Sequence, residues 1–262
     1  MKIQTMGEKS IDILGVGFSI RNYQEVLQQF ESWIVEGISH QVCIANVHTV
    51  ITCLHDQDFR DINNRSLVSL DGLPLVWYAN WVLGAAATRV CGPDLMLKCL
   101  DQGRSKGWRH FFLGGKPDVL EDLVSKMRAK YPGVEIVGWH SPPFRPLSAE
   151  EDGQLVSLIN DAKADFLWVG LGAPKQEKWI DAHLSQVQVP VQVGVGAAFD
   201  FHSERVPRAP LWMQRHGLEW LFRMWNDKRL VKRYLTTNPI FLAILLRDFV
   251  LIRLLKRAVK FG

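Results

Sequence analysis

The stretch ADFLWVGLGAPKQEKWI, residues 164–180, decides the fold class. Its apolar first half is typical of a buried β-strand. Two spaced glycines and a proline then lead to Lys175, Gln176 and Glu177, where a helix should begin. A tight glycine turn between a buried strand and a helix is common at the ligand-binding edge of a parallel sheet. The stretch therefore predicts one unit of a parallel α/β fold that carries a binding loop.

The flanking sequence repeats this pattern. We expect further strands at residues 39–46, 109–115, 134–140 and 189–196, and helices at residues 117–133, at residues 148–164 and from about Gln176. Ser148 precedes Glu151 by three residues, which is the spacing of a capping box. Strands that alternate with helices of this length predict a Rossmann-like parallel sheet with helices on both faces.

The composition excludes several classes of protein. A chain of 262 residues with 47% hydrophobic content can bury a full core, so disorder is not expected. The four cysteines form no CxxC pair and show no metal-type spacing with the histidines, which argues against a zinc site or a disulfide framework and fits a reducing compartment. The first twenty residues are a poor signal peptide.

The charge is distributed unevenly along the chain. Residues 201–262 contain 13 Lys/Arg and 4 Asp/Glu, a formal charge of +9, so the remaining residues carry −5 of the total of +4. We therefore divide the chain into an α/β core at residues 1–204 and a basic, amphipathic helical appendage at residues 205–262.

The end of the appendage combines apolar and basic residues. Its longest uninterrupted apolar run, Ile240–Leu246, is too short to cross a bilayer, so a helix lying in the interface of an anionic membrane is favoured. A basic helix packed on the body as ordinary core is the alternative. Nucleic acid is not expected as a partner, because it would explain the charge but not the apolar residues Phe241, Leu245, Phe249, Ile252 and Leu255.

Ligands of parallel sheets bind in the loops that follow the strands. Five loops of this chain carry polar or glycine-rich sequence there, and the loop at residues 194–201 places Asp200 at its mouth. Glycines in such loops let backbone N–H groups approach a phosphate, and the helix behind adds a favourable dipole. The glycines expected to do so are Gly72, Gly114, Gly172 and Gly196.

Common cofactor motifs are absent or incomplete. No GxxxxGK[ST] sequence occurs, and GLGAPK and GVGAAF lack the third glycine of a dinucleotide fingerprint, which disfavours a nicotinamide-dependent oxidoreductase. Asp56-Gln57-Asp58 resembles a metal-binding DxD sequence, but it lies in an expected helix over residues 50–65, where its aspartates would point to different sides. We expect no metal ion and no other cofactor.

Two charged residues allow both structural and chemical interpretations. Asp71 follows an apolar segment and precedes Gly72 and a proline, so it could cap a turn or act as a general base in a partly apolar pocket. Arg89 could pair with Asp94 or bind an oxyanion. The residues themselves do not decide between these roles.

Five segments together resemble the WecG/TagA/CpsF family of bacterial glycosyltransferases, glycosyltransferase family 26. They are SLDGLPLVW (69–77), RVCGPDLML (89–97), LGAPKQEKW (171–179), GVGAAFDF (194–201) and RAPLWMQRHGLEWLFRM (208–224). The resemblance covers residues 11–235 and implies a fold of the GT-E type. It also implies an inverting, metal-independent transferase that moves sugar from a UDP-sugar to a polyprenyl-diphosphate-linked saccharide in cell-surface polysaccharide synthesis, at the cytoplasmic face of the plasma membrane.

The resemblance also implies roles for individual residues. Asp71 matches the family's proposed general base, and Asp200 matches a nucleotide contact. Three arginines match those with which the family's appendage is thought to close over the site. These arginines are Arg223, Arg229 and Arg233. The remaining matches line the donor and acceptor pocket; they are Asn46, Arg89 and Gln176, with Lys175 or Glu177 supporting Gln176.

Two departures from the family pattern limit these assignments. Ile44-Ala45-Asn46 stands where many members have a Thr-Pro-Asn-like sequence, and Asn226-Asp227-Lys228-Arg229 stands where Glu-Pro-Arg-Arg is frequent. The donor therefore stays open between UDP-N-acetylmannosamine, its uronic acid and UDP-glucose. A non-catalytic, membrane-associated UDP-sugar-binding protein remains the main alternative from another class, and a homo-oligomer is compatible with the sequence.

Overall fold

The computed structural model describes residues 10–260, with side chains for residues 10–254; the side chain of Leu255 lies outside that range. Its centre is a six-stranded sheet in the order β4 (Leu67–Leu70), β3 (His40–Ala45), β8 (Val191–Gly194), β7 (Phe166–Gly170), β5 (Arg109–Gly114) and β6 (Glu135–His140). All neighbouring strands are parallel. The predicted parallel α/β fold is confirmed.

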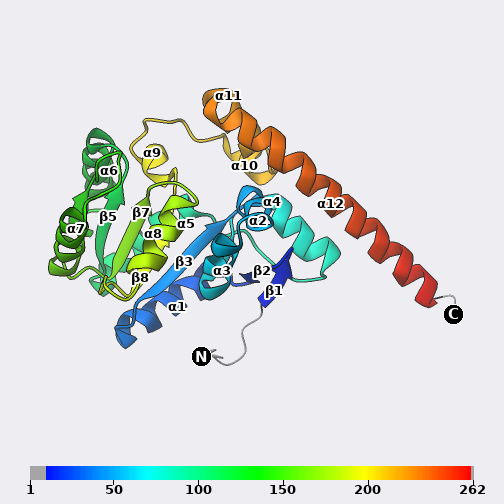
Figure 1. The fold of residues 1–262 in the computed structure, drawn as a ribbon, viewed down its shortest axis with the longest axis horizontal. Coiled ribbons are helices and arrows are strands. Elements are labelled where there is room, and N and C mark those ends of the chain that lie inside the picture. Colours follow the sequence, from blue (N-terminus) through cyan, green and yellow to red (C-terminus); the bar gives the residue numbers. More distant parts are fainter. Residues whose placement is uncertain (1–9, 261–262) are drawn as a thin grey trace.

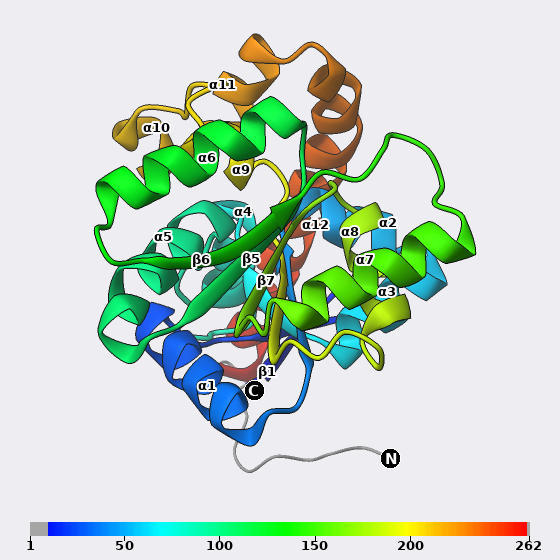
Figure 2. The same ribbon diagram turned by 90° about the vertical axis from the view of Figure 1, so that its left-hand side faces the viewer.

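Helices cover both faces of this sheet, as Figures 1 and 2 show. One face packs on α1 (Tyr23–Glu36), α5 (Gly92–Gly103), α6 (Pro117–Lys130) and the short α9 (Ala198–His202). Towards the β6 edge, the other face packs on α7 (Ala149–Asp161) and α8 (Lys175–His183). A single 3-10 turn, η2 (Arg104–Lys106), follows α5.

Strand β7 shows why the apolar run at residues 166–169 forms the centre of the core. Phe166 and Trp168 belong to the cluster beneath α1, α5 and α6, whereas Leu167 and Val169 belong to the cluster beneath α7 and α8. Side chains of a strand alternate between the faces, so a strand that is buried on both sides must be apolar throughout. The sheet therefore needs helices on both faces.

A third hydrophobic cluster lies at the β4 end of the sheet. It joins the antiparallel hairpin of β1 (Ser10–Ile13) and β2 (Val16–Ser19) to α2 (Val47–Cys53), α3 (Gln57–Arg65), α4 (Leu73–Trp77) and the π-helix η1 (Tyr78–Val82). Phe241 and Leu245 of the long helix α12 (Arg229–Lys260) are buried in the same cluster. The core and the appendage therefore share hydrophobic contacts.

The expectation of one helix over residues 50–65 was wrong. Helix α2 ends at Cys53 and α3 begins at Gln57, with Asp56 as its N-cap accepting a 2.9 Å hydrogen bond from the backbone N–H of Phe59. Aspartate is a favoured N-cap because its side chain satisfies a backbone N–H that has no partner within the helix. Asp56 also forms a 2.8 Å ion pair with Lys178, which accounts for this aspartate without a metal.

The chain after α9 forms three further helices, α10 (Leu211–Arg215), α11 (Glu219–Asn226) and α12. Figure 1 shows α12 running along one side of the body to the C-terminus. Its uninterrupted apolar run is too short to cross a bilayer, but the segment Arg229–Leu254 is long and apolar enough to do so by length and composition. Those two properties do not distinguish a membrane span from a surface helix. Its packing on α2 and η1 shows that α12 lies along the core.

Candidate active site

A cavity of about 1150 Å³ opens at the carboxyl edge of the sheet. Asn46 follows β3, Asp71 follows β4, Gly172 lies beyond β7 and Gly196 beyond β8, and all four line the cavity. The opposite wall comes from α11 and α12. Typical pockets for one small ligand measure about 300–1,000 Å³, so this cavity is slightly larger than that range.

Most of the residues predicted for the site lie around this one cavity. Gly114 and Glu177 do not line it. A Cβ atom on Gly114 would come within 2.8 Å of the Gly170 backbone, and the residue has φ +109°. Gly114 therefore allows β5 and β7 to end close together. The residues that do line the cavity are Asn46, Asp71, Gly72, Arg89, Gly172, Lys175, Gln176, Gly196, Asp200, Arg223, Arg229 and Arg233.

The ends of β3 and β4 hold Asn46 and Asp71 in place. The Asn46 side chain caps α2 by accepting hydrogen bonds from the backbone N–H groups of His48 at 3.0 Å and Thr49 at 3.4 Å. The backbone N–H of Asp71 donates to the carbonyl of Ala45 at 2.9 Å, which continues the ladder between the strands. The side chain of Asp71 is 23% exposed.

Arg89 is the nearest cation to Asp71. Its Nε donates to the Asp71 backbone carbonyl, and one terminal nitrogen lies 3.5 Å from the Asp71 carboxylate and 2.8 Å from that of Glu219. The predicted alternative of an Arg89–Asp94 pair was wrong, because Asp94 pairs with Arg208.

Burial raises the pKa of Asp71, while the Arg89 charge opposes that rise and the Glu219 charge adds to it. A carboxylate whose pKa is raised is a stronger base. The position of Asp71 at a strand end, inside a cavity, is thus suited to accepting a proton from a bound hydroxyl group.

Gln176 connects two of the glycine loops. Its Oε1 accepts hydrogen bonds from the backbone N–H groups of Gly172 at 3.1 Å and Gly196 at 3.0 Å, and its Nε2 donates to Glu177 at 2.8 Å. The carbonyl oxygen is therefore occupied within the protein. The sequence analysis expected Gln176 to bind substrate and did not foresee that it ties the β7 loop to the β8 loop.

Glu177 is buried behind this link, and burial raises the pKa of its carboxyl group. Its backbone carbonyl accepts a 2.9 Å hydrogen bond from Gln41. Glu177 thus orients the Gln176 amide from outside the cavity, whereas Lys175, at the start of α8, lines the cavity itself.

The three predicted arginines differ in their surroundings. Arg229 pairs with Asp227 at 2.9 Å and its side chain is 89% exposed. Arg223 stacks over the ring of Phe201, 5.4 Å from its centroid. Arg233 is largely enclosed, and burial lowers the pKa of its guanidinium group. Within residues 10–254, neither Arg223 nor Arg233 forms a direct ion pair with a carboxylate, so both bring positive charge to the cavity.

Asp200 lies on α9 at the same cavity. Burial raises the pKa of its carboxyl group, and the charges of Arg229 and Arg223 oppose that rise. No three His, Cys, Asp or Glu side chains of the described chain gather in a group that could hold a metal ion.

Four further residues at the cavity escaped the sequence analysis or received no role in it. They are His48, Glu219, Trp220 and Tyr234. Glu219 had a signal in the sequence, because it is one of only four acidic residues in the basic segment and lies inside a recognised motif. Trp220 lies in the same motif, and His48 follows β3 on α2. Tyr234 reaches the strand ends only because α12 docks there.

The model of the glycosyl transferase WecG/TagA/CpsF family matches residues 11–254. The chain belongs to this family. Its resemblance over the five motifs therefore reflects membership, and glycosyl transfer is the activity that the family shares.

Two relatives carry a more specific name. A Bacillus subtilis (strain 168) protein is 30% identical over 205 residues, which cover 76% of this chain and 78% of the relative. A Staphylococcus aureus (strain MW2) protein is 27% identical over 235 residues, covering 88% and 90%. Both are named N-acetylglucosaminyldiphosphoundecaprenol N-acetyl-beta-D-mannosaminyltransferase.

Proposed function

We propose that this glycosyltransferase moves N-acetylmannosamine from its UDP derivative to a polyprenyl-diphosphate-linked N-acetylglucosamine, with inversion at the anomeric carbon and without a metal ion. The names of the two relatives favour this sugar and this acceptor. The uronic acid of N-acetylmannosamine and glucose are the alternative donor sugars, because the departure at Ile44-Ala45 lies next to the cavity residue Asn46.

One observation carries the proposal. A single cavity contains a carboxylate with a raised pKa, Asp71, and two arginines without a carboxylate partner in the described chain, Arg223 and Arg233. Burying an unpaired cation is costly unless an anion comes to it. A diphosphate supplies that anion, and a sugar hydroxyl supplies the proton for Asp71.

The proposed reaction is a direct displacement. The acceptor hydroxyl attacks the anomeric carbon while Asp71 takes its proton, and the bond between that carbon and the phosphate oxygen breaks as UDP departs. The leaving diphosphate gains negative charge in this step. Arg223 and Arg233 would stabilise that charge through charge-assisted hydrogen bonds, the role that a divalent cation performs in many other transferases.

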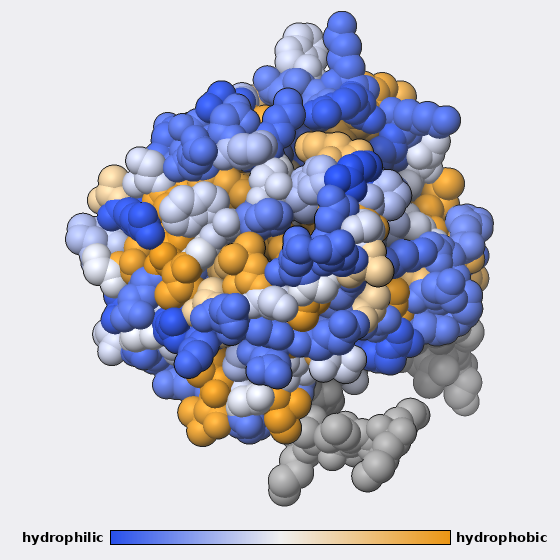
Figure 3. Space-filling model, turned by 60° about the vertical axis from the view of Figure 1, so that its left-hand side comes forward, coloured by the Kyte–Doolittle hydropathy of each residue, from blue (hydrophilic) through white to orange (hydrophobic). Residues whose placement is uncertain are grey.

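The appendage provides a surface for the lipid part of the acceptor. One side of α12 packs on the core through Phe241 and Leu245, and Tyr78 donates a 2.8 Å hydrogen bond to Asp248 of the same side. Around the rest of the helix, apolar residues are exposed, namely Leu235, Ile240, Leu242, Leu246, Val250, Leu251 and Leu254. Figure 3 shows a side of the molecule on which hydrophilic side chains are interspersed with smaller hydrophobic patches.

We propose that these exposed apolar residues of α12 rest in the cytoplasmic face of the plasma membrane, with the basic residues of the appendage near anionic headgroups. Removing residues 205–262 would be a poor test, because it would also uncover the core around Phe241 and Leu245. Leu246→Glu combined with Leu251→Glu changes only exposed positions. Co-sedimentation with anionic vesicles should fall several-fold while the melting temperature stays the same; unchanged binding would refute the orientation.

The experiment for the activity measures UDP release by the whole protein in EDTA. The donors are UDP-N-acetylmannosamine, its uronic acid, UDP-glucose and UDP-N-acetylglucosamine, each with and without a short-chain polyprenyl-diphosphate-N-acetylglucosamine. Acceptor-dependent release from UDP-N-acetylmannosamine, with a β-linked product, is expected.

Different failures of this experiment have different meanings. Release from another donor alone would replace the proposed sugar. Release that requires added Mg²⁺ would overturn the metal-independent mechanism. Tight UDP-sugar binding with no release from any donor and acceptor pair would favour the non-catalytic binding protein.

A further inference from the structure

Glu219 occupies an unusual place for an acidic residue. It is the first residue of α11, in the basic appendage, yet its side chain is only 15% exposed and lines the cavity beside Asp71. Its carboxylate accepts a 2.8 Å hydrogen bond from Arg89 and lies 3.8 Å from Arg208. A carboxylate among groups suited to binding anionic substrates needs an explanation.

The position of Arg89 explains why a carboxylate lies here. One terminal nitrogen of this guanidinium is shared between two carboxylates, 2.8 Å from Glu219 and 3.5 Å from Asp71. Only the shorter distance is a strong charge-assisted hydrogen bond. The Arg89 side chain is 21% exposed, so solvent screens these interactions less than on an open surface.

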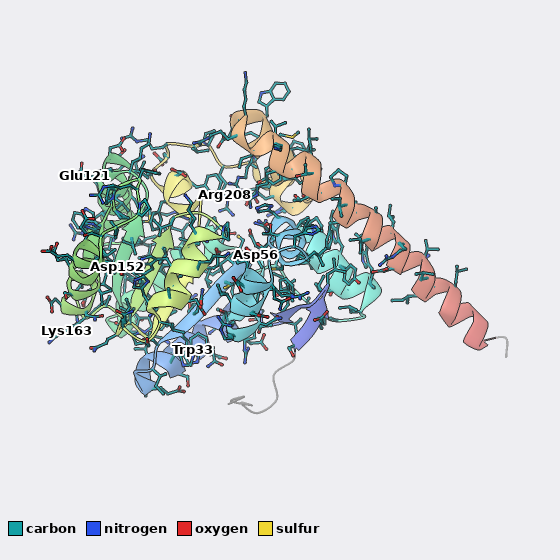
Figure 4. The ribbon with its side chains drawn as sticks, viewed as in Figure 1. Trp33, Asp56, Glu121, Asp152, Lys163 and Arg208 are labelled. Carbon is teal, nitrogen blue, oxygen red and sulfur yellow. The ribbon has the colours of Figure 1, made fainter. Side chains whose placement is uncertain are left out.

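Arg208 supports the arrangement from the other side. It pairs with Asp94 at the start of α5, and its Nε has no hydrogen-bond partner in the described chain. In Figure 4, Arg208 lies on the segment between the core and the appendage helices. The charges thus alternate along Asp94, Arg208, Glu219, Arg89 and Asp71, and they link the appendage to the strand end that carries the carboxylate.

We infer that Glu219 is a positioning residue that draws Arg89 away from the Asp71 carboxylate and so keeps Asp71 basic. The inference rests on the proposed function, in which Asp71 takes the proton of the acceptor. Without Glu219, the Arg89 guanidinium would pair with Asp71 at full strength, and a close cation makes a carboxylate a weaker base.

Other groups also face Asp71 and have to stay unchanged in a test. They come from the loop before α5, from α11 and from α12, and they are Arg89, Cys91, Arg223, Arg233 and Tyr234. Glu219→Gln leaves all of them in place and keeps the size of the side chain. It removes one negative charge and weakens the bond that holds Arg89.

The first measurement is kcat/KM against pH for the whole protein with donor and acceptor. In the wild type, activity falls as the pH drops through the raised pKa of Asp71, because the protonated carboxyl cannot act as a base. In Glu219→Gln, we expect this acid limb to move down by about one pH unit and the rate on the plateau to fall about three- to tenfold, since Asp71 is then a weaker base. Glu219→Asp should restore most of the wild-type profile.

The second measurement does not depend on turnover. Carboxyl carbon NMR of aspartate-labelled protein, with the Asp71 signal assigned by its loss in Asp71→Asn, follows the titration of Asp71 directly. If the Asp71 signal titrates at lower pH in Glu219→Gln but no donor is turned over, the proposed function fails and the inference stands. If transfer is observed and neither the NMR titration nor the acid limb moves, the inference is refuted and the proposed function stands.

Asp181→Asn is the matched control. Asp181 forms an ion pair with Arg65 of the same 2.8 Å length and does not line the cavity. This variant breaks a more exposed carboxylate–arginine pair outside the cavity, and it should leave the acid limb in place. An equal movement of the limb in both variants would contradict the inference.

Discussion

The loop between β7 and α8 and the appendage helices form opposite walls of one cavity, and they use their polar groups in opposite ways. At the end of this loop, Gln176 of α8 accepts hydrogen bonds from two backbone N–H groups through its carbonyl oxygen and donates one to Glu177 through its amide. In the appendage, Arg223 and Arg233 reach the cavity with no carboxylate paired to them in the described chain. The loop, which we call the core wall, therefore has its hydrogen-bonding groups paired within the protein. The appendage wall, formed by α11 and α12, instead presents arginines that can bind an anion.

This difference suggests that the two walls have different functions. Satisfied hydrogen bonds give the core wall a fixed shape, which suits the positioning of a sugar and a base. Uncompensated charge gives the appendage wall its affinity for diphosphate, but it costs stability when no ligand is bound. The two walls should therefore respond differently to substitution.

The largest effect is expected at the base. Asp71→Asn keeps the shape of the side chain but removes its capacity to accept a proton, so kcat should fall about 10²- to 10⁴-fold. Binding of UDP, measured by calorimetry, should change little, because the neutral amide repels the diphosphate no more than the carboxylate did. A kcat within about threefold of the wild type would remove Asp71 from the mechanism.

The appendage wall should lose activity and gain stability. Arg233→Met removes a buried, unpaired charge, so we expect kcat/KM to fall about 10- to 100-fold while the free energy of unfolding of the ligand-free protein rises by about 1 kcal/mol. Thermal denaturation and steady-state kinetics measure the two effects. Arg229→Gln, at the exposed Arg229–Asp227 pair, is the comparison and should cost less activity. A variant of Arg233 that is less stable and fully active would show that this arginine serves the fold.

A substitution in the core wall should instead lower the free energy of unfolding. Gln176→Met leaves the N–H groups of Gly172 and Gly196 without their acceptor, so the free energy of unfolding should fall by about 1–3 kcal/mol. Lys175→Met, at the neighbouring position, breaks no such link and should unfold like the wild type. If Gln176→Met raised KM without lowering stability, the amide would be a substrate contact, as the sequence analysis expected.

The difference between local and long-range contacts explains which features could be predicted from the sequence. The apolar run at residues 166–169 and the Ser148–Glu151 spacing are local signals, and the structure confirms both the sheet and the capping box. The break at Asp56 was missed because a capping aspartate and a solvated helical aspartate look alike in sequence. The link that Gln176 makes between two loops was missed because its two N–H donors lie in different loops, which only the sheet brings together.

The place of Glu219 beside Arg89 depends on how α11 docks, and this separation of 130 residues leaves no periodic trace in the sequence. The arginines of the appendage were found through a family motif, since a basic helix alone does not reveal which of its charges turn inward. Local structure was therefore predictable from residue spacing, whereas the charged residues that meet across the cavity could be identified only from the folded structure.

The smallest effect we predict is that of the Arg233 charge, on the appendage side of the cavity, on the pKa of His48, on the core side. His48, next to the Asn46 cap, has a pKa of about 4, lowered first by burial and second by the charge of Arg233. Arg233→Gln removes only the second cause, so the pKa of His48 should rise above about 4 and stay below the ordinary 6.5. NMR of the histidine ring signals measures this, with His110 as the control because burial alone lowers its pKa. A value for His48 that does not change would mean that the charge of Arg233 is not felt at the core wall, and the two walls would then act on the substrates independently.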